Sequence, residues 1–313
     1  MSENRKKYIT CVGGANIDIQ GFSNSVINMR DSNPGVVRLC AGGVGRNIAE
    51  NLARLGANVR MVSAVGEDPF GDIILKSCLD AGIDITNIER IPGKRSSVYL
   101  VLTDSDGDML AAISDMHILK EMDAGFILRH SEAFDSADAI VLDPNLSPES
   151  LEALVSGWSR KPLFADPIST TYAGMLKKYL PSLYMIKCNR QEAEIFADMP
   201  IRDDAELEIA AERVLKTGTK CAVITLGSKG VFYQDQGGLR LRKCHKPLIP
   251  VSATGAGDSF TAAMVYGWLN EMSPEASLEL AMKAAEITIM SEKTVTPEIG
   301  KLGFRCQVSG VRF

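Results

Sequence analysis

The chain has 313 residues, of which 45% are hydrophobic and 23% are charged, and its net charge is −5 at pH 7; this balance is ordinary for a globular protein with one large α/β domain or two small ones. The negative charge and the lack of a basic stripe argue against a nucleic-acid partner, and no apolar run is long enough for a signal peptide or a membrane span, so we expect a cytoplasmic location. The seven cysteines are scattered without CxxC spacing, which favours reduced thiols over zinc ligands or disulfides.

Short apolar runs alternate along the chain with amphipathic stretches, so we predict strands that alternate with helices. The predicted strands are residues 8–13, 59–65, 139–142, 163–165, 184–186, 221–226 and 231–234. The predicted helices are residues 44–55, about 69–81, one that opens at 147–149, one after each of the strands 163–165 and 184–186, about 256–269, and 275–291. This alternation is typical of an α/β protein whose doubly wound, mostly parallel sheet carries helices on both faces.

Two stretches interrupt the alternation. Residues 17–40 contain β-prone pieces without a helix, and residues 97–114 have the pattern of a hairpin with a Ser-Asp-Gly turn at 105–107. Both stretches rejoin the sheet at the end where its strands have their carboxyl termini, which is where ligands bind in open α/β sheets. We therefore predict one domain over residues 1–313, with a small β-sheet lid, built from these two segments, over a cleft.

The segment Thr254-Gly255-Ala256-Gly257-Asp258 is a glycine-rich turn directly before a predicted helix. Free N–H groups at a helix start and the positive end of the helix dipole together form an anion site. Asp258 in the first helical turn would accept a proton from an attacking hydroxyl, and we expect the dipole to keep it ionised at neutral pH. This combination predicts phosphoryl transfer to an alcohol; the alternative is a loop that only caps a surface helix.

Two motifs near the amino terminus suit a polar ligand. Gly42 and Gly43 precede a helix and would let a bulky ligand lie against the backbone, with Asn47 facing it; a tight loop-to-helix turn is the alternative. Asn16 and Asp18 follow the first strand, and strand alternation puts them on the same side. An amide and a carboxylate suit the hydroxyls of a sugar, although an Asx turn explains them equally well.

Two further motifs lie in the second half of the chain. Asn189 and Glu192 have the spacing of a helix capping box; alternatively, Glu192 lies near the water shell of a Mg²⁺ ion beside nucleotide phosphates. Small residues after the strand at 221–226 either form an ordinary turn or pass under a nucleotide base and its phosphates; they are Thr225, Gly227, Ser228 and Gly230. The chain has neither a Walker GxxxxGK[ST] motif nor a dinucleotide fingerprint.

Taken in order, the motifs NxD, GGxGxN, NxxE, TxGxxG and TGAGDSF resemble those of the ribokinase-like (PfkB) carbohydrate and nucleoside kinases over nearly the whole chain. The resemblance implies an αβα sandwich with a β lid, ATP as phosphoryl donor and Mg²⁺ as cofactor. It implies Asp258 as catalytic base, Gly255, Ala256 and Gly257 as anion hole, and Asn189 and Glu192 as the metal and phosphate motif. The implied ATP loop is Thr225, Gly227, Ser228 and Gly230 with Thr254, and the implied sugar site is Asn16, Asp18, Gly42, Gly43 and Asn47.

Within that family, segments such as ANIDIQG, DSNPG and KCNRQEAE resemble most those kinases that phosphorylate pseudouridine. The resemblance implies transfer to the 5′-hydroxyl of this nucleoside. Its base has an N1–H that uridine lacks, so the site needs an extra acceptor. The candidates are Asp31, Ser32, Asn33, Asp115, Asn145 and Asp166. Ribose, adenosine or uridine as acceptor, or a nucleoside-binding protein without activity, are the alternatives.

Two partner questions follow from the same resemblance. The family often has an aspartate that helps to hold a monovalent cation two positions before the threonine of TGAGD, where this chain has Ser252. Activation by K⁺ is therefore left open. Because the exposed faces of such β lids can pair between subunits, we expect a homodimer that forms through the lid.

Overall fold

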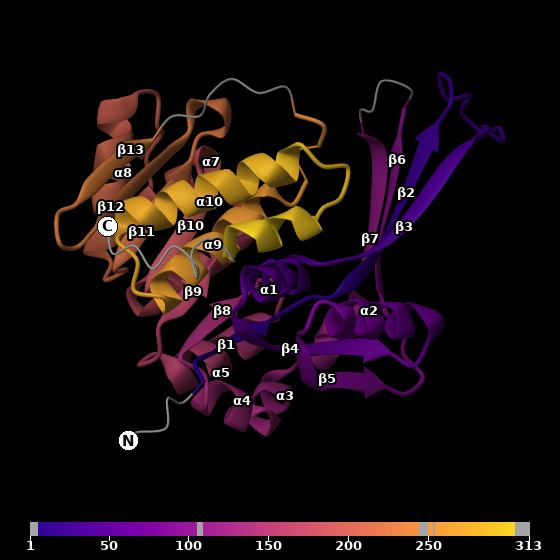
Figure 1. The fold of residues 1–313 in the computed structure, drawn as a ribbon, viewed down its shortest axis with the longest axis horizontal. Coiled ribbons are helices and arrows are strands. Elements are labelled where there is room, and N and C mark those ends of the chain that lie inside the picture. The colour runs from indigo at the N-terminus through magenta and orange to yellow at the C-terminus, as the bar shows by residue number, and fades with distance from the viewer. Residues whose placement is uncertain (1–5, 105–108, 244–249, 253, 304–313) are drawn as a thin grey trace.

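The computed structural model describes residues 6–104, 109–243, 250–252 and 254–303. A nine-stranded sheet forms its centre (Figure 1). In spatial order its strands are β13 (Arg240–Lys243), β12 (Val231–Asp235), β11 (Cys221–Thr225), β10 (Met185–Asn189), β9 (Leu163–Ala165), β8 (Ala139–Leu142), β1 (Tyr8–Val12), β4 (Asn58–Gly66) and β5 (Asp84–Ile91). All neighbours from β11 to β5 are parallel, whereas β12 and β13 join antiparallel. The predicted α/β class with a mostly parallel sheet is confirmed.

Helices cover both faces of this sheet. One hydrophobic core lies under α1 (Val44–Leu55), α2 (Pro69–Asp80), α9 (Ala256–Leu269) and α10 (Pro274–Ile289). The other lies under α3 (Ala124–Arg129), α4 (Ser131–Asp135), α5 (Pro148–Trp158), α6 (Thr170–Leu176), α7 (Arg190–Ala197) and α8 (Asp204–Lys216). Figure 1 shows α1, α9 and α10 together on one side of the sheet. None of the helices in the described part of the chain is long and apolar enough to span a membrane.

Local sequence signals define both ends of helix α1 and the start of helix α2. α1 begins after Gly43 and ends at Gly56, whose left-handed backbone (φ 102°) suits a glycine C-cap. The start of α2 is equally well defined, because Asp68 accepts a hydrogen bond from the Gly71 N–H and Pro69 occupies the first helical position. The predicted helices at 44–55 and about 69–81 are thus confirmed.

A smaller, four-stranded sheet projects from the end of the molecule above α1 and α2 (Figure 1). Its order is β3 (Gly35–Gly42), β2 (Asn16–Ser23), β6 (Ser97–Thr103) and β7 (Met109–Asp115). β2 and β6 are parallel, and the other two pairs are antiparallel. The two interrupting stretches therefore do form one sheet, while the predicted turn at 105–107 lies outside the described residues.

Candidate active site

Two cavities meet at the start of α9. The first, which we call the central cavity, has a volume of about 600 Å³ and lies between the base of the small sheet and the loops after β8 and β9. The second, the outer cavity, has a volume of about 340 Å³ and lies between α9, α10 and the loop after β11. Lys187 and Gly257 line both cavities, so ligands in the two would approach each other there.

Asp258 lies in the first turn of α9 and lines the central cavity. Only 8% of the residue is exposed, and one carboxylate oxygen accepts a hydrogen bond of 2.8 Å from Asn47 Nδ2. Burial, followed by the negative charge of Asp166, raises the pKa of Asp258 to about 7, against the opposing effects of Asn47 and Lys187. The expectation that Asp258 is ionised at neutral pH holds for only about half of the molecules at pH 7, because burial raises the pKa of this carboxyl group.

The backbone at Gly255 and Gly257 lies so close to neighbouring atoms that a larger residue would have to displace them. Such a turn leaves its N–H groups free to approach a phosphate. Gly255 has a φ of 82°, and a Cβ there would lie 2.1 Å from the carbonyl oxygen of Thr294. A Cβ on Gly257 would lie 2.8 Å from Lys187 Nζ. Gly255 and Gly257 line the central cavity, and Ala256 and Gly257 line the outer one. N–H groups in a first helical turn have no partner within the helix, so this turn can bind an anion between the cavities.

Lys187 was not singled out from the sequence. It lies in β10, and its ammonium group pairs with Asp166 Oδ2 at 2.8 Å, with only 7% of the residue exposed. Burial opposes the charge, yet the Asp166 carboxylate, helped by Glu192 and Asp258, raises the pKa of Lys187. Thr261 donates a further hydrogen bond of 3.0 Å to Asp166 Oδ2. A charged lysine between apolar residues in the buried part of strand MIKCN was the available signal.

The base of the small sheet contributes the polar pair predicted to follow the first strand of the chain. Asn16 Nδ2 donates to Asp18 Oδ1 at 2.6 Å, so the two side chains do lie on one side, and both line the central cavity. Burial raises the pKa of Asp18. Gly42 packs against the Asp18 carboxylate, where a Cβ would lie 2.3 Å from Oδ2, and Gly43 lines the cavity beside Asn47.

The buried carboxylate of Asp143 connects the loop after β1 to the start of α1. Asp143 follows β8, and its Oδ2 accepts from the Gly14 N–H at 2.9 Å and from the Gly45 N–H at 3.1 Å. Its other oxygen accepts from both the backbone and the side-chain amide of Asn145. Asp143 therefore ties the loop after β1 to the start of α1, and sequence reasoning missed it because no motif surrounds it.

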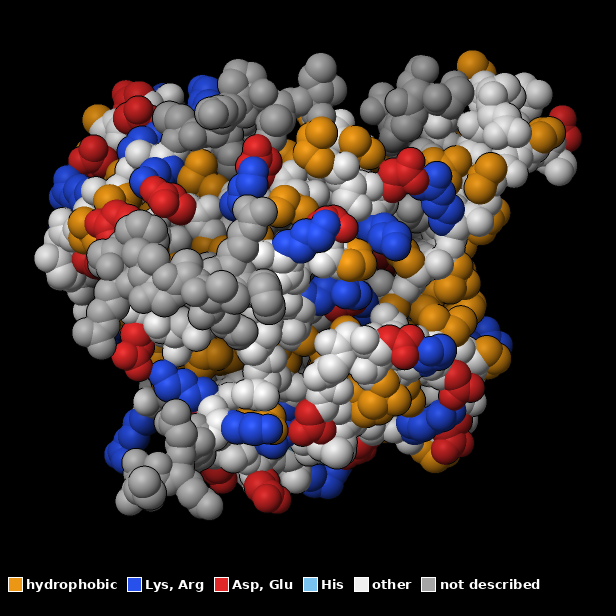
Figure 2. Space-filling model, in the orientation of Figure 1, with side chains coloured by type: hydrophobic (Ala, Val, Ile, Leu, Met, Phe, Trp, Pro, Cys, Tyr) orange, Lys and Arg blue, Asp and Glu red, His pale blue; other side chains and the backbone are white. Residues whose placement is uncertain are grey.

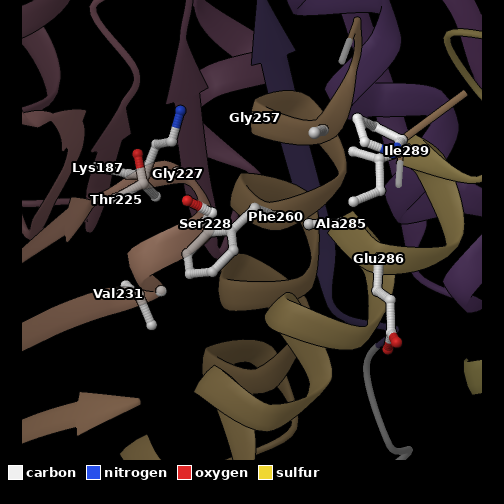
Figure 3. Close-up of a pocket in the computed structure, with 13 residues that line it drawn as sticks. Lys187, Thr225, Gly227, Ser228, Val231, Gly257, Phe260, Ala285, Glu286 and Ile289 are labelled. Carbon is white, nitrogen blue, oxygen red and sulfur yellow. The ribbon is translucent and has the colours of Figure 1, made fainter. Parts of the chain in front are cut away.

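The outer cavity has the loop predicted for a nucleotide on one side. Thr225, Gly227, Ser228 and Gly230 all line it. Its other walls are mostly apolar, with Val231, Pro250, Phe260, Ala285 and Ile289, and they also include Glu286 of α10. Figure 3 shows Phe260 of α9 between Ser228 and Ala285, with Lys187 and Gly257 at one end of the cavity. A mostly apolar cavity next to an anion site suits a nucleotide base and its phosphates.

Asn189 and Glu192 form the capping box of α7. The Asn189 side chain accepts from the Glu192 N–H at 3.0 Å, and the Glu192 carboxylate accepts from the Asn189 N–H at 2.7 Å. Neither residue is among those that line the two cavities, whereas Thr254 lines the central one. No group of three or more His, Cys, Asp or Glu side chains within the described residues is arranged to hold a metal ion.

The candidates for reading the base separate into two groups. Asn145 and Asp166 line the central cavity. Ser32 is exposed between β2 and β3, where its N–H donates to the Asp31 carboxylate. Asp115 is also exposed, pairs with His117 at 2.6 Å, and lines a separate depression beside Arg95. Tyr99 and Ser114 of the small sheet, which were not singled out from the sequence, do line the central cavity.

Known proteins resemble this chain over most of its length. The profile described as pfkB family carbohydrate kinase matches residues 6–299. Pseudouridine kinase from Escherichia coli (strain K12) is 33% identical over 94% of each chain. Guanosine-inosine kinase from Exiguobacterium acetylicum is 30% identical over 93% of this chain and 97% of its own. A crystal structure of a Clostridium perfringens protein assigned as a sugar kinase is 34% identical, covers 97% of this chain and 96% of its own, and superposes with a TM-score of 0.87.

Proposed function

We propose that this chain, which belongs to the pfkB family of carbohydrate kinases, transfers the γ-phosphoryl group of ATP to the 5′-hydroxyl of pseudouridine. One observation carries the proposal: Asp258 lines the central cavity at the point where that cavity meets the outer one, beside Gly257 and Lys187. A base, an anion cradle and a buried cation at the junction of two ligand-sized cavities are the groups that phosphoryl transfer to an alcohol requires.

In the proposed complex the nucleoside occupies the central cavity. Asn16 and Asp18 hold the ribose 2′- and 3′-hydroxyls, and the 5′-hydroxyl points toward Asp258. The Asp258 carboxylate accepts the hydroxyl proton as the oxygen attacks the γ-phosphorus, and the bond to the β-phosphate oxygen of ATP breaks. With a pKa of about 7, Asp258 is a base whose strength suits proton transfer at neutral pH.

The phosphates of ATP would lie at the junction of the cavities. The N–H groups of residues 255–257 and the Lys187 ammonium group stabilise the charge on the transferring group, and each well-aimed donor of this kind contributes about 2.7–4 kcal/mol in studied enzymes. The adenine base of ATP would lie against Phe260 and the loop from Thr225 to Gly230. Because Lys187 is already paired with Asp166, its position is fixed before the substrate binds.

A Mg²⁺ ion accompanies ATP in this proposal. Magnesium prefers oxygen ligands and retains several waters. The Asn189 and Glu192 side chains offer such oxygens but also cap α7, so they fit contact through the water shell. Bound there, the ion would supply charge neutralisation for the phosphate oxygens.

Ser252 Oγ accepts from the Thr254 N–H and brings no carboxylate, so we expect activity without a K⁺ requirement. Assays in sodium and potassium salts would check this.

For recognition of the base we favour Asn145. Its Nδ2 donates to Asp143 at 2.9 Å, which turns its carbonyl oxygen away from Asp143, and it lines the central cavity. That oxygen would accept the N1–H of pseudouridine. Asp166, the other candidate on the cavity wall, is already engaged by Lys187 and Thr261.

The decisive experiment incubates the purified protein with ATP, Mg²⁺ and pseudouridine and detects the nucleoside monophosphate by mass spectrometry. Uridine, ribose, adenosine and guanosine form the comparison panel, because the similarity to a guanosine-inosine kinase makes another nucleoside the second candidate acceptor. We expect pseudouridine to be preferred in kcat/KM. Preference for another acceptor would contradict the substrate, and no product from any acceptor would contradict the kinase proposal itself.

The small sheet is also the surface through which we propose a homodimer. Hydrophobic side chains gather along the side of the molecule that carries it (Figure 2). The exposed ones include Val36, Val37, Leu39, Leu102 and Ile113. Sedimentation equilibrium would test this, with a monomer mass at micromolar concentration as the contrary result.

A further inference from the structure

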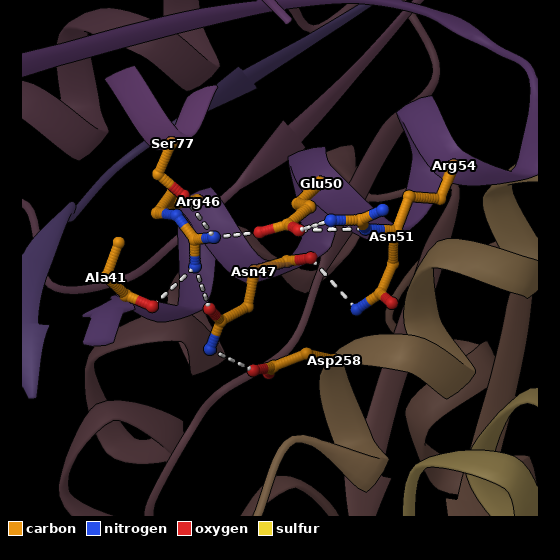
Figure 4. Close-up of polar contacts among 8 residues, drawn as sticks. All are labelled: Ala41, Arg46, Asn47, Glu50, Asn51, Arg54, Ser77 and Asp258. Carbon is orange, nitrogen blue, oxygen red and sulfur yellow. Dashed lines mark hydrogen bonds and ion pairs between the residues drawn. The ribbon is translucent and has the colours of Figure 1, made fainter. Parts of the chain in front are cut away.

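We propose that Arg46 is a positioning residue that acts through Asn47 to hold the Asp258 carboxylate in place for proton transfer. This inference rests on the proposed function, because it assigns Asp258 as the base. Figure 4 shows the three side chains in series, with Arg46 and Asn47 on α1 and Asp258 on α9. Arg46 is not one of the site residues predicted from the sequence, and it is not among the described residues that line the central cavity.

The orientation of the Asn47 amide is the central step. Arg46 Nη1 donates to Asn47 Oδ1 at 2.7 Å, and Asn47 Nδ2 donates to Asp258 Oδ2 at 2.8 Å. If the amide were flipped, its NH₂ would face a guanidinium that can only donate, and its oxygen would face the carboxylate. The Arg46 guanidinium therefore selects the one orientation in which Asn47 donates to Asp258.

Contacts with two other structural elements and with its own helix hold Arg46 itself. Nη1 also donates to the Ala41 carbonyl of β3 at 2.8 Å, and Nη2 donates to Ser77 Oγ of α2 at 3.2 Å. Glu50, one turn further along α1, forms a buried ion pair with Arg46 and accepts from Arg54 Nε at 2.8 Å. Only 3% of Arg46 is exposed. A planar, forked guanidinium can serve these partners at once, whereas a lysine ammonium group cannot reproduce the fork.

The hydrogen bond from Asn47 matters because the surroundings of Asp258 otherwise favour its protonated form. Burial opposes a negative charge at this position most strongly, Asp166 after β9 and Asp143 after β8 oppose it further, and Lys187 on β10 supports it. Donation from Asn47 also supports the charged form. Loss of Arg46 would free the amide to rotate, so the ionised fraction of Asp258 at neutral pH would fall.

The test combines kinetics with a titration that needs no turnover. In Arg46→Met we expect the midpoint of the Asp258 carboxyl titration, followed by ¹³C NMR and assigned with Asp258→Asn, to rise by roughly 0.5–1 pH unit. We expect kcat at pH 7 to fall about tenfold while the KM for ATP stays unchanged. Arg46→Lys should recover only part of both effects. Arg54→Met is the matched control, because Arg54 also pairs with Glu50 but lies outside the described hydrogen bonds of Asn47, and it should leave the midpoint where it is.

The route through Asn47 is tested in a second background. When Asn47→Ala is already present, adding Arg46→Met should not move the midpoint further. An unshifted midpoint in folded Arg46→Met, or the same shift in the Asn47→Ala background as in the wild type, would overturn the inference. If Arg46→Met does not fold, Arg46→Gln and Arg46→Lys give the same two readings. Failure of the proposed function would be seen separately, as a lack of product from the wild-type protein whose titration can still be measured.

Discussion

The proposed active site beside the large sheet and the strands of the small sheet hold their polar side chains very differently. Asp166, Lys187 and Asp258 are at least nine-tenths buried and are bonded to one another or to Asn47, which comes from another element. In the small sheet most of β3 and all of β7 are exposed. The groups proposed to perform the chemistry are thus fixed by the protein core, whereas the small sheet is covered mainly along β2 and β6, and Asn16 and Asp18 lie at the base of β2.

The strongest way to test this contrast is to remove the buried base. We expect Asp258→Asn to lower kcat about 10³-fold while the KM for the nucleoside changes little, because the amide keeps the size of the side chain and can still contact Asn47. Steady-state kinetics with pseudouridine would measure both parameters. Asp80→Asn, an exposed aspartate on α2, serves as the control, and a normal kcat in Asp258→Asn would exclude the proposed role.

Substitution of a glycine in the turn before Asp258 should give the second largest loss of kcat. In Gly255→Ala the new methyl group would meet the Thr294 carbonyl oxygen at 2.1 Å in a left-handed backbone, so the N–H groups of the turn must shift. Loss of one well-aimed donor costs about 10²-fold or more in kcat. Gly157→Ala in α5, where a Cβ meets nothing within 4 Å, is the matched control. Equal activity of the two variants would show that the turn is not an anion site.

Asp258 should also make both activity and stability depend on pH. Its folded-state pKa of about 7 lies above the value of about 3.9 in an unfolded chain. Below about pH 7 the base becomes protonated, so kcat should fall about tenfold per pH unit. The same linkage means that the bound proton stabilises the fold below about pH 4 and that this stabilisation is lost as the pH rises through 7.

A comparison of thermal melting separates the two effects. Asparagine does not ionise, so Asp258→Asn should gain stability relative to the wild type as the pH is raised from 4 to 8, with a difference on the order of a few kcal/mol. Parallel melting curves at all pH values would contradict the raised pKa. Because melting needs no substrate, this result is independent of the acceptor.

Much of the fold follows from local signals, and the missed elements lack them. α1 was predicted to the residue because Gly56 stops it and its apolar positions recur on one face. Strand β5 was missed because it is an edge strand that pairs only with β4. The β5 sequence, DITNIERI, is only partly buried and so lacks a clear apolar pattern. Helix α8 turns Leu207, Ala210, Ala211 and Val214 toward the core, and a stripe containing two alanines gives a weak apolar pattern.

The site could be predicted where one short motif contains the chemistry, as with Gly255, Gly257 and Asp258. It could not be predicted where the chemistry depends on burial or on residues far apart in the chain. Asp258 was expected to stay ionised because the sequence shows neither its burial nor the nearby carboxylate of Asp166, which together raise its pKa to about 7. Lys187 and Asp143 stand alone in apolar or irregular sequence, so only the folded arrangement brings Lys187 to the cavity and Asp143 to the Gly14 and Gly45 N–H groups.

The smallest effect we predict sharpens the contrast between the two regions. Asn145→Ala should lower the preference for pseudouridine over uridine at least about tenfold, because an acceptor for N1–H on the wall of the central cavity would be lost, whereas Ser32→Ala and Asp115→Ala should leave the preference unchanged as long as these residues stay outside the central cavity. Competition between the two nucleosides, read by mass spectrometry of the products, gives the ratio directly. If Ser32→Ala or Asp115→Ala changed the preference instead, the small sheet would have to close over the nucleoside further than in this structure, and base recognition would belong to the exposed region and not to the buried one.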